Sequence, residues 1–480
     1  MKLVTMTVLS EPEIRQIHEA SVDILANVGV KVLSGHMRES LAVKGLHIDP
    51  AAKTVRFPRA VLEDALAACP SRFEVFDREG NPAFVLGDGA PKIAAGHNAV
   101  FWLDSDSGAT RSSTVADVER FARICEQLPA IDMIGIPVMP QDVDVPQLSL
   151  LHGVRACIEN SRKPIFFSTD RRDVNRGCIE LLRAAFAGDL DKQVYGISQL
   201  SPTSPLFWEE TVCETILDTL TTNVPLAILP EPNAGVSAPF TLAGLLTMNN
   251  AECLSGLAMI QLLKPGHNVM YANSWTTTDM RSGAALVGSI ETSICRIAGA
   301  QLARFYRVPA HTTAPNSDNH AHDEQNAWEK TFSLMAAVGA GNDLIVNCGM
   351  FATGMTYSDE QLLMDAEIAS MCRRLAAGVE VTPDTIAANL IKQIGPQGDS
   401  YLTQEHTLER LRSKEYLVPD LAVRGPFASW LAGGGHDTYG LSRARAAKLA
   451  ANPANRLDEK RRIALDAVIH KVEADMAGEE

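Results

Sequence analysis

Two histidines in a polar segment are the first residues whose types and spacing suggest chemistry. His320 and His322 are one residue apart, and Asp318, Asp323 and Glu324 lie close to them in the sequence. Imidazole and carboxylate ligands suit zinc or manganese, so this cluster could hold a metal ion. The same residues also suit the first turn of a helix, where acidic side chains interact favourably with the helix dipole. The sequence leaves both interpretations open.

A run of three glycines, Gly433-Gly434-Gly435, precedes His436 and Asp437. A glycine-rich turn can cradle phosphate when it follows a strand and opens a helix. No predicted strand leads into this run. Turn-forming glycine followed by an aspartate that caps a helix explains the segment as well.

Any site in this chain would be positioned by strands and helices that alternate from about residue 92. Short apolar or β-branched runs alternate with longer helical stretches, a pattern typical of βα units. The predicted strands are 92–96, 133–138, 164–168, 194–199, 225–230, 268–273, 308–312 and 344–348. The helices predicted after them are 114–128, 147–160, 172–187, 208–222, 240–263, 283–306, 323–340 and 358–377. This count favours an α/β protein built as a closed (β/α)8 TIM barrel. An open doubly wound sheet is the alternative, but the first strand lacks a G-x-G-x-x-G turn.

Segments of different character flank the predicted barrel. Residues 1–91 contain a helix start at Ser10-Glu11-Pro12-Glu13, a second helix from Pro58 to Ala68 and short alternating pieces. We predict that they form a small N-terminal α+β cap. The barrel would span residues 92–378. Residues 379–480 are predicted to be a helical C-terminal extension that ends in a charged helix, and this extension favours a homo-oligomer.

Length and composition indicate a large globular protein. The chain has 480 residues, of which 46% are hydrophobic and 21% are charged, and its formal net charge is -15. An acidic protein without a basic stripe is not expected to bind nucleic acid in general. No run approaches the roughly 18–20 apolar residues that cross a bilayer, and the start lacks a signal-peptide core. Nine cysteines are scattered singly. We expect reduced, mostly buried thiols and a cytoplasmic protein.

The loops that follow the strands should carry the active site, because catalytic residues of a TIM barrel lie at the carboxyl ends of its strands. These loops are rich in amides, hydroxyls and aromatic rings, and they lack an obvious nucleophile. The polar candidates are His97, Asn98, Gln199, Glu231 and Asn273. The aromatic candidates are Trp208, Trp275, Phe351 and Tyr357. Such rings either pack as an apolar lid or form a cage that attracts a quaternary ammonium ion.

Several stretches together carry a family resemblance. They are residues 232–244 (PNAGVSAPFTLAG), Asn250-Ala251-Glu252, Lys264-Pro265-Gly266, the run from Ile17-His18-Glu19-Ala20 to Gly29-Val30, the turn Asp106-Ser107-Gly108, and Asp365-Ala366-Glu367. In these stretches the chain resembles the trimethylamine methyltransferase family. The resemblance spans nearly the whole chain, which makes it far more specific than any single short motif.

The resemblance implies a (β/α)8 methyltransferase that passes a methyl group from a methylated amine to the corrinoid, a cobalamin, of a separate protein. No cofactor of its own would be tightly bound. The founding members of the family carry pyrrolysine, whereas this sequence contains only the standard twenty residues. It therefore resembles the branch without pyrrolysine, whose known activities include quaternary amines such as glycine betaine. The expected partners are a small methylated amine and a corrinoid protein, with neither nucleic acid nor membrane.

Within this scheme the four aromatic candidates form the predicted cage. Glu231 either faces the cation or pairs with a neighbouring barrel arginine. The other polar candidates would bind a substrate carboxylate or line the path of the corrinoid. Two alternatives remain: a metal-dependent barrel enzyme that uses His320, His322 and Asp318, and a non-catalytic protein that binds quaternary amines.

Overall fold

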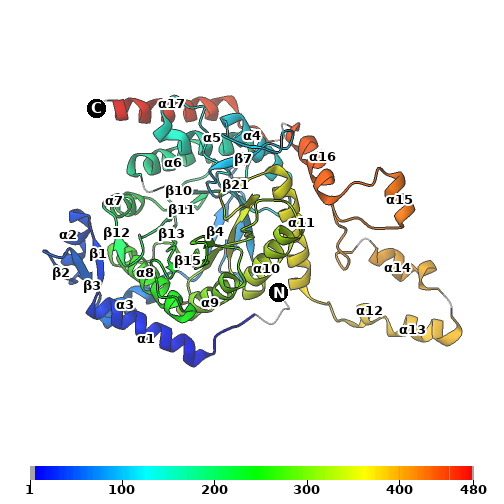
Figure 1. Ribbon diagram of the computed structural model, residues 1–480, viewed down its shortest axis with the longest axis horizontal. Coiled ribbons are helices and arrows are strands. Elements are labelled where there is room, and N and C mark those ends of the chain that lie inside the picture. The colour runs from blue at the N-terminus through cyan, green and yellow to red at the C-terminus, as the bar shows by residue number, and fades with distance from the viewer. Residues whose placement is uncertain (1–5, 170, 399, 412, 453–454, 478–480) are drawn as a thin grey trace.

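Eight parallel strands in a closed ring form the centre of the computed structural model, which describes residues 6–169, 171–398, 400–411, 413–452 and 455–477 (Figure 1). The barrel strands are β6 (Lys92–Ala95), β9 (Met133–Ile134), β10 (Ile165–Ser168), β11 (Gly196–Leu200), β13 (Leu226–Ile228), β15 (Val269–Asn273), β18 (Ala310–Thr313) and β19 (Leu344–Cys348). Each pairs with the next in chain order, and β19 pairs with β6 to close the ring. The predicted TIM barrel and the positions of its eight strands are confirmed.

One long helix follows each barrel strand. These helices are α4 (Val115–Glu126), α5 (Ser149–Asn160, after the 3-10 turn Pro146–Leu148), α6 (Arg172–Ala185), α7 (Glu210–Thr219), α8 (Leu242–Leu263), α9 (Ile290–Tyr306), α10 (Glu324–Ala340) and α11 (Asp359–Ala377). Local hydrogen bonds fix several helix starts. Thr114 and Asp117 form a capping box at α4, and the Asp323 carboxylate accepts the N–H groups of Gln325 and Asn326 at α10. Such caps satisfy backbone donors that the helix itself leaves free.

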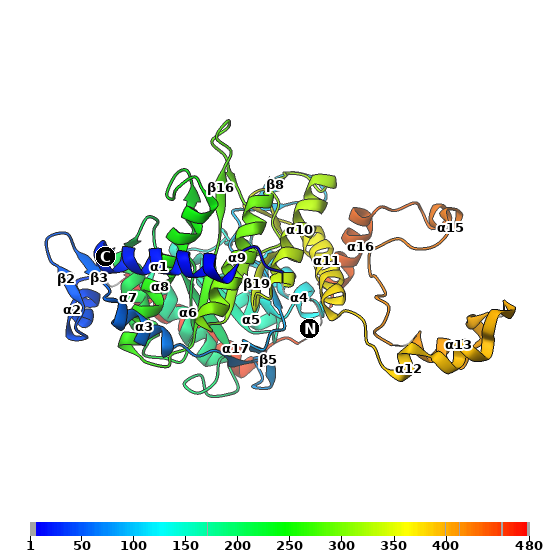
Figure 2. The ribbon, with the colours of Figure 1, turned by 90° about the horizontal axis from the view of Figure 1, so that it is seen from below.

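A hairpin closes the amino-terminal end of the barrel. It consists of β4 (Phe73–Phe76) and β5 (Pro82–Leu86), and Val75 pairs with Val194 just before β11 begins. Phe73, Val75 and Leu86 belong to the same apolar cluster as the side chains that fill the barrel. Figure 2 shows β5 at the end of the barrel opposite to β16. The interior is therefore a packed core that is sealed at this end.

The N-terminal segment forms a small α+β unit whose sheet includes a strand from a loop of the barrel. Its elements are α1 (Glu11–Asn27), β1 (Val30–Val32), α2 (Gly35–Val43), β2 (His47–Asp49), β3 (Thr54–Arg56) and α3 (Arg59–Ala67). Strand β1 pairs with β12 (Phe207–Trp208), which lies in the loop after β11. Helices α1 and α3 pack on α8. The cap is thus fixed to one side of the barrel.

Two small sheets rise from the carboxyl ends of the barrel strands. The first contains β14 (Asn233–Ala234), β16 (Thr276–Thr278) and β17 (Ala285–Leu286), and the second contains β7 (Phe101–Leu103), β8 (Thr110–Arg111), β20 (Met350–Phe351) and β21 (Thr356–Tyr357). The segment 232–244 contains β14, the tight turn after it and the first residues of α8. Gly235 has φ +87°, and a Cβ atom there would lie 2.9 Å from the Phe240 ring. Only glycine suits such a position.

The C-terminal part of the chain packs on the barrel through its last two helices and, before them, at Leu421. Its elements are α12 (Pro383–Ile386), α13 (Ala388–Ile394), the 3-10 turns Gly395–Gln397 and Tyr401–Thr403, α14 (Glu405–Arg410), α15 (Phe427–Ala432), α16 (Thr438–Ala450) and α17 (Glu459–Ala477). Helix α16 lies against α11 and α4, and α17 lies against α5 and α6. Helices α12 to α15 project sideways (Figures 1 and 2). Among the described residues no helix has the length and apolarity that a membrane span requires.

Candidate active site

A chain of polar side chains crosses the carboxyl-terminal end of the barrel, which we call the barrel mouth. His97 Nδ1 lies 2.8 Å from Asn347 Oδ1, and His97 Nε2 lies 3.0 Å from Gln199 Nε2. The Asn347 amide in turn donates to Asn316 Oδ1 over 2.7 Å. This network links the ends of β6, β11 and β19 with the loop that follows β18.

The network holds His97 in one neutral form. An amide oxygen only accepts hydrogen bonds, so Nδ1 carries the proton toward Asn347 and Nε2 accepts from the Gln199 amide. Burial lowers the pKa of His97, although the hydrogen bond to Asn347 favours the charged imidazolium. The imidazole is therefore a neutral, oriented group at physiological pH.

Backbone strain is concentrated at the same place. Asn347 has φ +126° and lies where the pairing of β19 with β6 is interrupted between Val346 and Cys348. Asn98 has φ +58° just after β6. Positive φ is unfavourable for residues other than glycine, and such strain is typical of functional sites. An interruption of this kind also re-aims a side chain, which here is the amide that binds His97.

Glu231 follows β13 and presents a carboxyl group at the barrel mouth. The side chain is exposed, yet desolvation raises its pKa to about 7. Together these observations fit a carboxyl that solvent reaches from one side and protein surrounds on the others. Glu231 makes no hydrogen bond or ion pair with another described residue, so the predicted partner arginine is not seen. Its charge is free to interact with a ligand.

A buried ion pair holds two of the strand-end loops in place. Lys330 Nζ in α10 lies 2.8 Å from Asp365 Oδ2 in α11, and both side chains are fully buried. Lys330 also donates to the Pro315 carbonyl over 3.2 Å, and Asp365 accepts the Gly349 N–H over 2.7 Å. Burial raises the pKa of Asp365, and the neighbouring Lys330 opposes that rise. The pair thus anchors the loops after β18 and β19.

The four predicted cage residues are packed in the apolar core. Trp208, Trp275 and Tyr357 are 0% exposed, and Phe351 is 1% exposed. Their polar ring atoms bond within the core: Trp275 Nε1 to Asn273 Oδ1 (2.6 Å), Trp208 Nε1 to Ser255 Oγ (3.0 Å) and the Tyr357 hydroxyl to Asp359 Oδ1 (2.9 Å). The structure does not bring these rings together at an open surface. Their positions are those of rings that pack as an apolar layer. A cage around a cation would require these four rings to move out of the core.

The other predicted polar residues have different surroundings. Gln199 meets His97, and its Oε1 has no hydrogen-bond partner among the described residues. Asn98 is half-buried and donates to the Ser168 carbonyl over 3.3 Å. Asn273 is fully buried and holds the indole of Trp275, which makes it a structural residue.

Sequence reasoning did not single out Asn347 as a site residue. It lies inside the predicted strand 344–348, where a buried amide resembles any other strand residue. The available signal was the one strongly polar side chain in the run Leu-Ile-Val-Asn-Cys. A buried amide in such a run needs hydrogen-bond partners, and here one of them is the histidine at the mouth.

The residues that could have formed a metal site are hydrogen-bonded to separate partners. His322 Nε2 lies 3.1 Å from Ser358 Oγ, whereas Asp318 accepts the backbone N–H groups of Val287 and Gly288. His320 is exposed. Within the described ranges no three histidine, cysteine, aspartate or glutamate residues are arranged to hold a metal ion. The acidic segment instead begins α10, as the helix-start interpretation predicted.

The glycine run also has a structural role. The Asp437 carboxylate accepts the Gly440 N–H over 2.7 Å and caps α16. Gly434 and Gly435 have φ +102° and +61°, as a turn of this kind requires. The turn-and-cap interpretation is confirmed.

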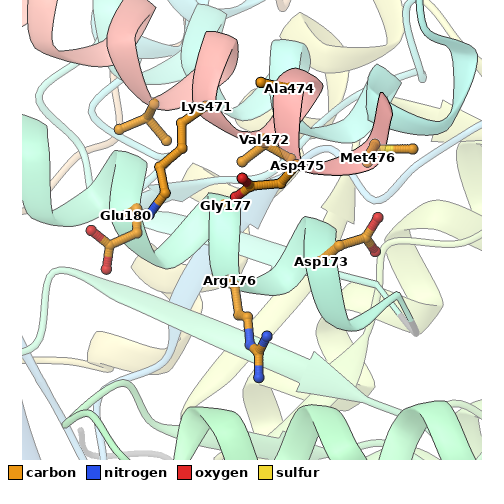
Figure 3. A pocket seen from close by; sticks show the side chains of 10 residues that line it. Asp173, Arg176, Gly177, Glu180, Lys471, Val472, Ala474, Asp475 and Met476 are labelled. Atoms are coloured by element: carbon orange, nitrogen blue, oxygen red, sulfur yellow. The ribbon is translucent and has the colours of Figure 1, made fainter. Parts of the chain in front are cut away.

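A hollow outside the barrel is lined by residues of α6 and α17 (Figure 3). Its volume is about 540 Å³, and it is lined by Asp173, Arg176, Gly177, Glu180, Lys471, Val472, Ala474, Asp475 and Met476, with Val468. A Cβ atom on Gly177 would lie 2.9 Å from Leu151 and 3.2 Å from Val472. The bare glycine lets α17 approach the barrel, and the hollow contains none of the strand-end residues.

Two solved structures share this architecture over almost the whole chain. The hydroxylamine complex of MtmB covers 98% of this chain and 88% of its own, with a TM-score of 0.53 and 12% identity. The Methanosarcina barkeri monomethylamine methyltransferase (MtmB) covers the same shares, with a TM-score of 0.51 and 11% identity. At such identities the likeness supports the fold.

Curated relatives match at higher identity. A trimethylamine methyltransferase MttB of Desulfitobacterium hafniense is 28% identical over 430 residues, 89% of this chain and 86% of the relative. The MttB of Methanosarcina thermophila is 29% identical over 456 residues, 94% of each chain. A glycine betaine methyltransferase of D. hafniense is 29% identical over 434 residues, 88% of each chain.

The sequence profile of a single family extends across the cap, the barrel and the C-terminal helices. That profile, described as trimethylamine methyltransferase (MTTB), matches residues 1–477. The family assignment rests on this match, which covers all but the last three residues of the chain, and on the barrel fold. The chain therefore belongs to the trimethylamine methyltransferase (MTTB) family.

Proposed function

We propose that this protein is a corrinoid-dependent methyltransferase that moves a methyl group from a small methylated amine to Co(I) of a corrinoid held by a separate protein. Family membership supports the class of reaction. The observation that carries the proposal is the Glu231 carboxyl, which is free of protein partners among the described residues and lies at the barrel end that holds the polar network. A free carboxyl at that position suits a cationic substrate.

A quaternary amine such as glycine betaine fits this end of the barrel. Glu231 would face the ammonium group. The half-buried side chains of Asn98, Ser201 and Ser274 offer amide and hydroxyl donors for a substrate carboxylate. The sequence has no pyrrolysine, and one of the relatives is a glycine betaine methyltransferase. These features support a quaternary rather than a tertiary amine.

Transfer of a methyl group from a quaternary amine does not require a general acid or a general base. When the methyl carbon passes to Co(I), the C–N bond breaks and nitrogen keeps the bonding pair. The amine leaves as a neutral tertiary amine, so no proton has to be supplied. The residues at the barrel mouth would then act by binding and orienting the substrate at near-attack distance.

The strength of the Glu231 contact matters for the rate. The substrate loses its positive charge during transfer, so a strong ion pair would stabilise the ground state more than the transition state. A carboxyl whose pKa is about 7 is only partly ionised at neutral pH. Its moderate attraction binds the cation and does not oppose the loss of charge strongly.

We also propose that the protein works in the cytoplasm and forms a homo-oligomer. All nine cysteines are free thiols, as expected of a reducing compartment. The projecting C-terminal helices support self-association.

A panel of methylated amines tests the proposed reaction. The purified protein is mixed with chemically reduced cobalamin and with glycine betaine, carnitine, choline, proline betaine or trimethylamine, and loss of the Co(I) absorbance is followed. We expect at least one quaternary amine to consume Co(I), and Glu231→Ala to slow the reaction. Amine binding with no consumption of Co(I) would identify a non-catalytic binding protein. Activity that depends on stoichiometric zinc or manganese would instead support the metal-dependent alternative.

A further inference from the structure

A second cavity is lined by α10, α11 and the start of α16, which packs beside α11 (Figure 1). Its volume is about 420 Å³, and small-molecule sites are typically about 300–1,000 Å³. None of the residues of the polar network at the barrel mouth lines it, and neither does Glu231. The cavity is therefore separate from the candidate active site. We call it the helix pocket.

Four carboxylates line the helix pocket without a cationic partner. They belong to Asp323, Glu324, Glu367 and Asp437. None of them forms an ion pair with another residue in the described ranges. Lys330, whose charge acts on His322 in the pocket wall, is already paired with Asp365. Carboxylates that share one pocket repel each other unless a cation lies among them. The charge of the pocket thus favours a positively charged ligand.

Helix capping uses only some of these carboxylate oxygens. Asp323 caps α10 and Asp437 caps α16, each through its Oδ1 atom. The Oδ2 atoms of both aspartates make no hydrogen bond with the part of the chain that the structure describes. The Glu324 carboxylate in the first turn of α10 makes none there either, although its charge suits the helix dipole. Oxygen acceptors therefore remain for a ligand.

A buried amide in the pocket wall also lacks a donor. Gln361 is 1% exposed, and its Nε2 donates to Asp365 Oδ1 over 2.9 Å, which fixes the orientation of the amide. Its Oε1 has no hydrogen-bond partner among the described residues, and the same holds for Glu367 Oε1. Buried polar atoms are normally paired. Since the atoms left over are oxygens that only accept, the missing partner is an N–H or O–H donor.

Apolar and aromatic side chains complete the walls. Met364 and Ile368 on α11 are half-buried, and so is Tyr439 on α16, whose ring lies 5.1 Å from the His322 ring. Burial lowers the pKa of His322 to about 4, so this imidazole is neutral and does not repel a cation. The face of a tyrosine ring attracts an ammonium group. These walls suit a ligand that combines hydrocarbon with positive charge.

We propose that the helix pocket binds a linear polyamine, a chain of methylene groups that carries two or more ammonium groups. Several carboxylates around one pocket match several charges on one ligand. The ammonium N–H groups would donate to Gln361 Oε1 and Glu367 Oε1, and the methylene groups would lie against Met364 and Tyr439. A quaternary amine fits less well because it has no N–H group. A metal ion also fits less well, since no three suitable ligands are arranged for one within the described residues.

Isothermal titration calorimetry of the full chain with spermidine, at physiological salt, tests the proposal. The site variant is Glu324→Gln with Asp437→Asn, in which asparagine can still cap α16. The matched control is Glu39→Gln with Glu74→Gln, which removes the same charge from two exposed positions. A third variant, Ala327→Lys, places an ammonium group at an exposed position of the pocket wall, and Ala327→Gln is its neutral counterpart. Thermal unfolding verifies that each variant is folded.

We expect one spermidine to bind per chain. The site variant should bind it about tenfold more weakly, because two charge contacts are lost. Ala327→Lys should lose binding because its own ammonium group occupies the pocket, whereas the control and Ala327→Gln should bind as the unsubstituted chain does. Tetramethylammonium should not displace spermidine, because it carries charge without an N–H group.

The absence of saturable spermidine binding would overturn the proposal. Equal weakening in the site variant and in the control would overturn it too, because it would show attraction to the acidic protein as a whole. Full binding by Ala327→Lys would place the ligand elsewhere, and displacement by tetramethylammonium would contradict the role of the N–H groups. These outcomes do not depend on whether the protein transfers methyl groups.

Discussion

Glu231 should make binding of a cationic amine depend on pH. Its pKa is raised to about 7 by desolvation, and the cation favours the ionised carboxylate. Affinity for glycine betaine should therefore fall as the pH is lowered through about 7, by about tenfold per unit below it, because one proton must leave for each cation bound. Isothermal titration calorimetry at a series of pH values measures this dependence.

Glu231→Gln is the matched variant for that experiment. It should bind glycine betaine more weakly at high pH and show a flat profile. The folded carboxyl has a higher pKa than the unfolded one, so its contribution to stability is lost as the pH rises toward about 7. The variant should therefore unfold at a higher temperature than the unsubstituted protein above neutral pH. A slope that persists in Glu231→Gln would assign the titration to another group.

Asn347 offers a way to separate backbone strain from hydrogen bonding. Asn347→Ala removes the bonds to His97 and Asn316 and keeps φ at +126°, whereas Asn347→Gly removes the same bonds and relieves the backbone. We expect both variants to lose methyl transfer to a similar extent. The alanine variant should lose about 1–3 kcal/mol of unfolding free energy, because buried partners are left unpaired, and the glycine variant should lose about 1 kcal/mol less.

Urea unfolding and the rate of Co(I) consumption measure the two effects. If the glycine variant were as unstable as the alanine variant, φ at this position would not be a source of strain. If either variant kept full activity, the orientation of His97 would not matter for transfer.

Helices α10 and α11 fix the loops at the barrel mouth through Lys330 and Asp365. Lys330→Met should lower the unfolding free energy by about 3–5 kcal/mol, because it leaves a buried carboxylate without its cation. Lys330→Met combined with Asp365→Leu should recover most of that loss, since an apolar pair carries no uncompensated charge. Guanidinium unfolding measures both. A double variant as unstable as the single one would show that the loop carbonyls, rather than the charge, determine the cost.

The barrel elements could be predicted because their pattern is local, whereas the surroundings of the aromatic residues could not. Each strand is a short apolar run followed by a longer helical stretch, so the eight repeats are visible in the sequence. Trp208 and Trp275 follow strands as active-site residues do. They are nevertheless buried, because the cap sheet extends through β12 and Asn273 binds the Trp275 indole. Those contacts join distant segments, and local patterns do not contain them.

The candidate active site could likewise be predicted only in part from the sequence. His97, Gln199 and Glu231 follow or end predicted strands, so topology placed them at the barrel mouth. The interruption of β19 at Asn347 depends on its pairing with β6, which lies far away in the sequence. The solvation of Glu231 likewise depends on all the loops around it.

The whole barrel depends on the hairpin at its amino-terminal end. Phe73→Ala removes a side chain that is 7% exposed and packs with the barrel core, and we expect it to lower the unfolding free energy by about 3–5 kcal/mol. Phe84→Ala, in the same hairpin and only partly buried, is the matched control and should cost less. Denaturant unfolding measures both, and methyl transfer to free cobalamin should persist at low temperature. Equal losses for the two variants would argue against a sealing role for Phe73.

The hairpin β4–β5 packs against the amino-terminal end of the barrel core, so in the proposed reaction both substrates would approach from the carboxyl-terminal end. In that reaction the methylated amine must bind before the corrinoid protein covers the carboxyl-terminal end of the barrel. The demethylated amine can leave only after the corrinoid protein dissociates. Turnover would then follow a compulsory order, with the amine first in and last out. Excess corrinoid protein would slow the cycle by blocking the entrance.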